Sequence, residues 1–196
     1  MNRKSAGVVS GWLVAGCVVV LAACSKAESP ATPVTSDSEK AAMSIRITSD
    51  AFTEGNPIPV EYTCDGSDIS PPLAWSGVPA NSKSLALICD DPDAPSGTFV
   101  HWVVYSIPAG ETQLPKSVPS TPTLANGARQ GKNGFGTIGY RGPCPPKGGP
   151  HRYFFHIYAL DTTIDEAAGA ARSSIDRAMK GHIIGEGHVM GTYQRK

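Results

Sequence analysis

Residues 139–153 read GYRGPCPPKGGPHRY and run directly into the apolar stretch FFHIYAL. Eight of these fifteen positions are Gly or Pro, a composition that excludes a helix or a central strand. The stretch that follows, Tyr153–Leu160, is apolar on both alternating faces, which predicts a strand covered on both sides. A stiff loop that delivers His151 to the mouth of a buried strand is one way to build a small pocket. The alternative interpretation is a rigid surface connection.

Strand signals dominate the rest of the chain. Four further stretches are rich in Val, Ile, Phe, Tyr and Trp or alternate polar with apolar residues, and we expect strands there: Ser44–Thr48, Pro57–Tyr62, Ser84–Cys89 and Phe99–Ile107. One helix is expected at Ser173–Lys180, with Ser173 or Ser174 as its N-cap. Residues 115–136 are expected to form a long loop. The pattern predicts an all-β fold, an antiparallel β-sandwich with minor peripheral helices.

Five segments carry a resemblance to a known family. They follow one another as YTCDGSDISPPLAWSGVP (62–79), DPDAP (91–95), HWVVYSIP (101–108), GYRGPCPPKGGPHRYFFHIYALD (139–161) and GHIIGEGHVMGTYQR (181–195). In this order they resemble the phosphatidylethanolamine-binding protein family, in its bacterial and archaeal Raf kinase inhibitor-like branch. The resemblance covers roughly residue 43 to the end of the sequence. It implies a β-sandwich with Greek-key connections.

The resemblance also implies a small anion pocket. In this family the pocket accepts phosphate-like groups, including the phosphoethanolamine head of phospholipids. Histidine N–H groups, and backbone N–H groups of the Gly139–Gly149 loop, can donate to phosphate oxygens. We interpret Asp91 as an acceptor that orients an imidazole. Matched residue by residue, the pocket would be formed by Asp91, His101, Tyr140, Pro145, Pro146, His151 and Tyr153.

Strand alternation gives an expectation for His101. Counting by twos, it shares a face with Phe99, Val103 and Tyr105, so we expect it in packed or pocket-lining surroundings. The remaining histidines are interpreted as structural residues.

No motif points to an enzyme. The sequence contains no GxSxG elbow, HExxH pair or Walker loop, and the resemblance requires no metal or cofactor. We therefore expect a non-enzymatic binding protein. The alternative is an inhibitor or modulator of another protein, an extracytoplasmic serine protease rather than a kinase. A homodimer is a further possibility.

The N-terminus has the layout of a secretion signal. Arg3 and Lys4 precede uncharged residues 5–25, as in a signal peptide. Residues 21–24 read LAAC and resemble the lipobox of bacterial lipoproteins, with Cys24 as the lipid acceptor. We predict a signal peptide at 1–23, lipidated Cys24 with a flexible tether to 42, and a domain at 43–196. An uncleaved membrane anchor is the alternative.

This organisation places the domain at the cell envelope, held to a membrane by lipid, on the periplasmic side if the cell has two membranes. The mature chain would carry 15 basic and 17 acidic residues, because the removed segment contains Arg3 and Lys4 and no acid. Such a balance does not indicate a nucleic-acid-binding surface.

Three cysteines remain after the predicted signal and lipid site. Cys89 lies in an apolar strand and is expected to pack as a small hydrophobic residue. Cys64 and Cys144 lie in Gly- and Pro-rich loops, and both belong to segments that resemble the family. We predict that these two form a disulfide, as an exported protein permits. The alternative is three free thiols.

Overall fold

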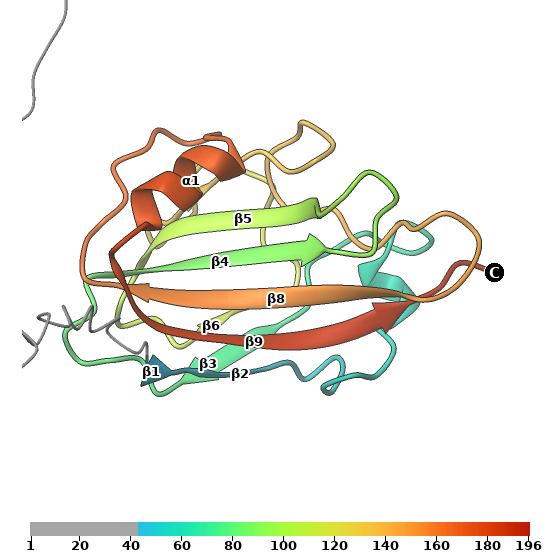
Figure 1. Cartoon of the computed structure of the whole chain (residues 1–196), viewed down its shortest axis with the longest axis horizontal. Helices are drawn as coiled ribbons and strands as arrows, with labels where there is room; N and C mark the ends of the chain where they lie inside the picture. Colours follow the sequence, from blue (N-terminus) through green and yellow to red (C-terminus); the bar gives the residue numbers. More distant parts are fainter. Residues whose placement is uncertain (1–42) are drawn as a thin grey trace, which may run out of the picture. The chain divides into compact units, whose positions relative to one another are not determined.

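Residues 43–196 are described by the computed structural model, and their strands form two sheets (Figure 1). The larger sheet has the order β1-β9-β8-β4-β5-β7 and the smaller β2-β3-β6. The parallel β1–β9 pair aside, neighbouring strands within these residues are antiparallel. The strands are β1 Met43–Ser44, β2 Arg46–Thr48, β3 Leu73–Ser76, β4 Ser84–Asp91, β5 Phe99–Pro108, β6 Gln113–Leu114, β7 Arg129–Gln130, β8 His151–Leu160 and β9 Ile183–Tyr193.

This architecture confirms the predicted all-β fold. The Greek-key order of the connections stays a prediction. The predicted signal peptide, the lipid site Cys24 and the tether to residue 42 lie outside the described residues. Between residues 43 and 196, no helix is long and apolar enough to cross a membrane.

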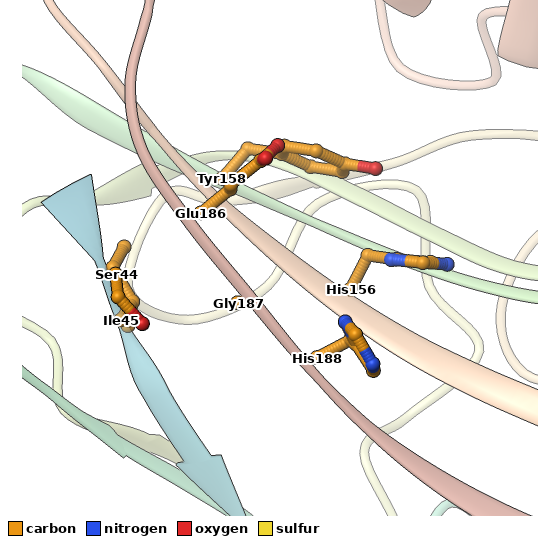
Figure 2. Close-up of a pocket in the computed structure, with 7 residues that line it drawn as sticks. All are labelled: Ser44, Ile45, His156, Tyr158, Glu186, Gly187 and His188. Carbon is orange, nitrogen blue, oxygen red and sulfur yellow. The ribbon is translucent and has the colours of Figure 1, made fainter. Parts of the chain in front are cut away.

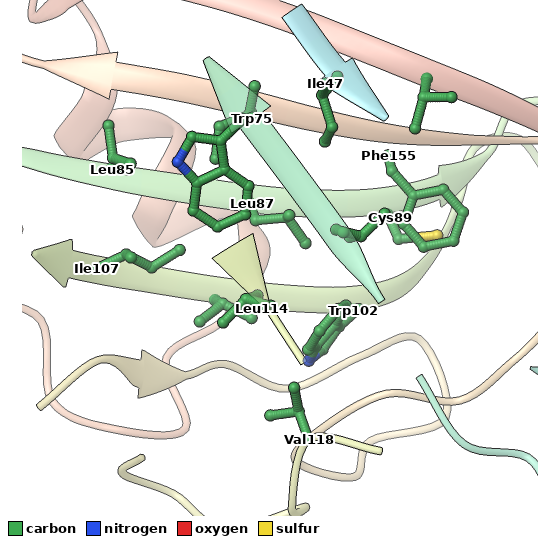
Figure 3. Packing of buried hydrophobic residues seen from close by; sticks show 14 of the residues in the cluster. Ile47, Trp75, Leu85, Leu87, Cys89, Trp102, Ile107, Leu114, Val118 and Phe155 are labelled. Carbon is green, nitrogen blue, oxygen red and sulfur yellow. The ribbon is translucent and has the colours of Figure 1, made fainter. Parts of the chain in front are cut away.

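The main core lies between the two sheets. Trp75 of the smaller sheet packs over the larger sheet, whose inner face carries Leu87, Trp102 and Phe155 (Figure 3). Trp102 is fully buried, and its indole N–H donates to the Gln130 side-chain oxygen at 2.7 Å. This bond satisfies the polar atom that a buried tryptophan carries into a core. Two sheets that bury alternate side chains between them are the architecture of a sandwich.

A second core lies on the other face of the larger sheet, beneath helix α1 (Arg172–Met179). The predicted helix is present, but the predicted serine cap is wrong. The N-cap is Ala171 and makes no side-chain capping bond. Instead, the first turn is fixed by the Arg172 guanidinium, which donates to Asp176 at 2.6 Å and to Asp90 of β4 at 3.1 Å. The helix and sheet residues that pack here include Ile88, Val103, Tyr105, Ile175 and Met179.

Two of the predicted strands differ from the structure. Pro57–Tyr62 is not a strand: residues Val60–Tyr62 form a 3₁₀ helix, and Pro57 makes only an isolated bridge to Thr192. The prolines at 57 and 59 carry no N–H for a ladder, so the apolar pattern was misleading. The predicted strand Ser44–Thr48 is divided at buried Ile45, so that β1 joins the larger sheet and β2 the smaller.

Candidate functional site

A β-bulge sets the direction of His101. Cys89 pairs with Trp102 and Asp90 with Val100, so that His101 is an extra residue without a partner on β4. Such a residue breaks the alternation of side chains along the strand. His101 therefore lies against Tyr153, whereas Val103 and Tyr105 pack under α1. The prediction that His101 shares a face with those two residues is wrong, because alternation cannot be counted through a bulge.

His101 is held in one ring orientation. Its side chain is buried, and Nδ1 donates to the carbonyl oxygen of Arg141 at 2.6 Å. The rings of Phe99 and Tyr153 each meet it edge to face, with centroids 5.2 Å away. Burial lowers the pKa of His101, although the Arg141 carbonyl and the charge of Asp91 oppose this shift. The imidazole is therefore favoured in its neutral form.

Buried Asp91 and the largely buried His151 form a hydrogen-bonded pair. The end of β4 and the start of β8 lie at the same end of the sheet (Figure 1). There His151 Nδ1 lies 2.8 Å from Asp91 Oδ2, and the two side chains are 13% and 4% exposed. The other carboxylate oxygen of Asp91 accepts the backbone N–H of Asp93 at 2.8 Å. The carboxylate thereby orients the imidazole, which is the role expected of Asp91.

These side chains surround a cavity of about 170 Å³, which we call the Asp91 cavity. It is large enough for a small oxyanion or a headgroup. Its wall combines three titratable side chains with prolines and aromatic rings. The lining residues are Asp91, Ala94, Pro95, Ser96, Phe99, His101, Phe135, Cys144, Pro145, Pro146 and His151.

The structure thus brings together five of the seven residues expected at the site. Tyr153 lies just beneath the cavity, where it contacts His101; its hydroxyl is buried and makes no hydrogen bond of normal geometry with residues 43–196. Burial and the nearby charge of Asp91 raise the pKa of Tyr153. Tyr140 is placed differently. It packs in the core against Trp102 and donates its hydroxyl to the carbonyl oxygen of Tyr62 at 2.8 Å.

The two arginines nearest the Asp91 cavity are already engaged. Arg152 donates to both carboxylate oxygens of Asp93, at 2.9 and 2.7 Å. This ion pair lowers the pKa of Asp93 to about 2. Arg141 pairs with Asp68 at 2.7 Å and lies over the ring of Phe135. Neither guanidinium lines the cavity.

The 139–153 loop is fixed to the segment that begins at Tyr62. The Cys64–Cys144 disulfide is present, which confirms the predicted pair. The N–H of Gly142 donates to Asp68 Oδ1 at 2.7 Å. The backbones approach so closely that a Cβ on Gly142 would lie 2.1 Å from the Tyr62 oxygen. The wall of the Asp91 cavity is therefore held by a covalent bond and by close backbone contact.

A larger cavity lies elsewhere, on the outer face of β8 and β9, and none of the predicted site residues lines it. Its volume is about 550 Å³ (Figure 2). His156 and His188 face each other there across the two strands, with ring centroids 5.6 Å apart. His188 and Glu186 are exposed to solvent, so their polar groups need no buried partner. In residues 43–196, no group of three or more His, Cys, Asp or Glu side chains could hold a metal ion.

We regard the Asp91 cavity as the candidate site because it holds titratable groups that are buried or nearly so. Burying such groups costs free energy, and groups of this kind that line a cavity are typical of functional sites. Sequence reasoning missed Phe135, an aromatic rim residue that is 46% exposed. Its signal is an aromatic residue between glycines, in GFG (134–136). It also missed Asp68, which holds Arg141 and Gly142. Asp68 has φ +55°, a conformation that asparagine and aspartate tolerate best among residues with a side chain.

Comparisons with known proteins find similarity to one family. The family profile described as phosphatidylethanolamine-binding protein matches residues 48–194. A UPF0098 protein of Methanothermobacter thermautotrophicus is 54% identical over 145 residues, covering 74% of this chain and 95% of that protein. The crystal structure of CT736 from Chlamydia trachomatis, described as a homologue of phosphatidylethanolamine-binding protein, superimposes with a TM-score of 0.71 at 41% identity. Escherichia coli YbcL, described as a new member of the mammalian PEBP family, gives 0.73 at 34% identity. The two structural matches each cover 78% of this chain and 99% of the other.

Proposed function

Because the chain belongs to the phosphatidylethanolamine-binding protein family, we propose that the Asp91 cavity receives a phosphate group. The ligand would be a small phosphorylated molecule or a phospholipid headgroup such as phosphoethanolamine. The observation that carries this proposal is the hydrogen-bonded pair of Asp91 and His151, which lines the cavity together with His101. When protonated, His151 can donate from Nε2 to a phosphate oxygen, while Asp91 holds the opposite ring nitrogen.

The lining of the cavity supports binding rather than catalysis. A nucleophilic mechanism needs a hydroxyl or thiol that is hydrogen-bonded to a base. Cys144 is consumed in the disulfide, and Ser96 makes no hydrogen bond to either histidine of the cavity. We therefore propose a non-enzymatic binding protein.

We predict that His151→Ala weakens phosphate binding more than any other single alanine substitution in the cavity. The change removes a charge-assisted hydrogen bond, so the dissociation constant should rise by about tenfold or more. The measurement is an NMR titration of the purified protein with inorganic phosphate and with phosphoethanolamine, following the imidazole resonances of His101 and His151.

The matched control is His188→Ala, an exposed histidine on the outer face of β9, which should bind phosphate as the unmodified protein does. Imidazole resonances of His101 and His151 that stay unchanged at millimolar phosphate and phosphoethanolamine would contradict the proposed function.

We also propose that Cys24 carries lipid and holds the domain at the cell envelope. The support is the sequence LAAC at 21–24, which follows an apolar segment. Mass spectrometry of the membrane-extracted protein should find a chain that begins at Cys24 and carries lipid on it. We expect Cys24→Ser to abolish incorporation of a labelled fatty acid, whereas Cys17→Ser should not, and a membrane-extracted chain without lipid on Cys24 would refute the assignment. A homodimer and an extracytoplasmic protease target stay predictions from the sequence.

A further inference from the structure

We propose that the Asp91 cavity selects phosphate groups that carry a proton, so that it binds phosphate monoesters as monoanions and rejects diesters and sulfates of equal charge. This inference rests on the proposed function, and it concerns hydrogen-bond donors and acceptors rather than charge alone.

His101 presents a hydrogen-bond acceptor to the cavity. A carbonyl oxygen only accepts hydrogen bonds, so the 2.6 Å contact with the Arg141 oxygen requires a proton on Nδ1. In the neutral ring, Nε2 is then a lone pair. The backbone of Gly142 also interacts with the ring, but Nδ1 to Arg141 is its one hydrogen bond of normal geometry within residues 43–196, and the side chain lines the cavity. A bound ligand must therefore bring a donor for Nε2.

His151 presents a hydrogen-bond donor to the cavity. Its Nδ1 faces the Asp91 carboxylate, so the only site through which His151 can donate to a ligand is Nε2 of the protonated ring. A singly protonated phosphate matches this pair of histidines. One of its oxygens accepts from His151, and its P–OH donates to His101.

Apart from the Ser96 hydroxyl, the rest of the wall offers few donors. Pro145 and Pro146 have no N–H. The N–H of Arg141 donates to the His101 carbonyl oxygen at 3.1 Å, and the N–H of Gly142 donates to Asp68. These two N–H groups are therefore unavailable to an anion. Because neither nearby guanidinium lines the cavity, a second negative charge on the ligand would face Asp91 without compensation.

The charged groups around His101 do not change its favoured protonation state. Asp91 of β4 and Asp68 of the neighbouring loop both favour the protonated ring, and burial outweighs them. Tyr153 of β8 meets the ring edge to face. The rings of Phe99 and Phe135, which carry no charge, also contact it in T-shaped arrangements. The neutral ring, and hence the acceptor at Nε2, is the favoured state.

Three small anions separate the possibilities: methyl phosphate, dimethyl phosphate and methyl sulfate. Near pH 6, close to the second pKa of a phosphate monoester, each is available as a monoanion, and only methyl phosphate carries an O–H. Calorimetric titration of the full chain should show methyl phosphate binding at least about tenfold more tightly than the other two, the usual cost of an unpaired buried acceptor. Its affinity should fall more steeply with rising pH than that of methyl sulfate, by about a further tenfold per pH unit above about pH 7, because all three anions need the proton on His151 and only methyl phosphate also needs its own.

The substitution His101→Gln tests the acceptor itself, because the amide can donate to an oxygen that has no proton. The preference for methyl phosphate over methyl sulfate should fall toward one. The matched control is His156→Gln, the same change on the outer face of β8, which should keep the preference. If the His101 variant does not fold, the difference between the pH series of methyl phosphate and methyl sulfate on the unmodified protein is an independent test.

The outcomes are distinct. If neither methyl phosphate nor inorganic phosphate binds at any pH, the proposed function and this inference both fail. If the three anions bind equally at every pH, the inference fails and the proposed function stands. Tightest binding of dimethyl phosphate would also overturn the inference, and would assign the cavity to the diester of intact phospholipids.

Discussion

Replacing Cys64 and Cys144 together with alanine is expected to lower the free energy of unfolding by about 4–5 kcal/mol. The two residues are 80 positions apart in sequence, and in the chain-entropy model the cross-link removes that amount of loop-closure entropy from the unfolded chain. For a domain of this size the melting temperature should fall by about 10–18 °C. Thermal and urea unfolding with and without reductant measure the effect.

The control is the effect of reductant on the unmodified protein and on the double variant. Reductant should bring the unmodified protein down to the stability of the double variant, and should leave the double variant unchanged. Because Cys144 lines the Asp91 cavity, phosphate affinity should fall in parallel. A melting temperature that stays within about 2 °C of the original would show that the disulfide contributes little.

The second large effect is expected for Gly142→Ala. The new Cβ would lie 2.1 Å from the Tyr62 oxygen and 2.9 Å from the Thr63 Cα, and both are backbone atoms that cannot rotate away. The loop must therefore move outward. We expect a loss of roughly 3 kcal/mol in stability. Binding should weaken as well, because the Arg141 carbonyl that holds His101 would move with it.

Gly149→Ala is the matched control for this substitution. It lies in the same loop, and an added Cβ there would meet nothing within 4 Å. Urea unfolding and the phosphate titration should separate the two variants clearly. Equal stability of both would show that the contact between residues 62 and 142 yields easily.

The long buried strands could be predicted from sequence because their apolar runs are continuous. The observed bounds lie within two residues of the expected ones for β4, β5 and β8. A strand that is buried on both faces has apolar side chains at successive positions, and this run is visible in the sequence. Local irregularities could not be predicted. The bulge at His101 depends on how β4 and β5 pair, which is a property of two segments and not of either sequence alone.

The candidate site, too, could be predicted only in part from the sequence. The residues that contact one another were expected on the strength of the resemblance, but their chemical states depend on geometry. Only the structure shows that Asp91 contacts His151 rather than His101, and that a carbonyl oxygen fixes the ring of His101. Tyr140 was expected at the pocket from the resemblance alone, yet its ring packs against Trp102 in the core.

The burial of Cys89 bears on the order of events during oxidation. Cys89 lies in β4, where it pairs with Trp102 of β5 and Phe155 of β8, and it is completely inaccessible to solvent. Burial raises the pKa of its thiol well above the usual value, and thiol–disulfide exchange proceeds through the thiolate. Once the sheet has formed, Cys89 can no longer attack or mispair with Cys64 or Cys144. Assembly of the larger sheet thus protects the Cys64–Cys144 disulfide from exchange with Cys89. A nascent chain that is oxidised before β4 joins the sheet could instead form a wrong disulfide.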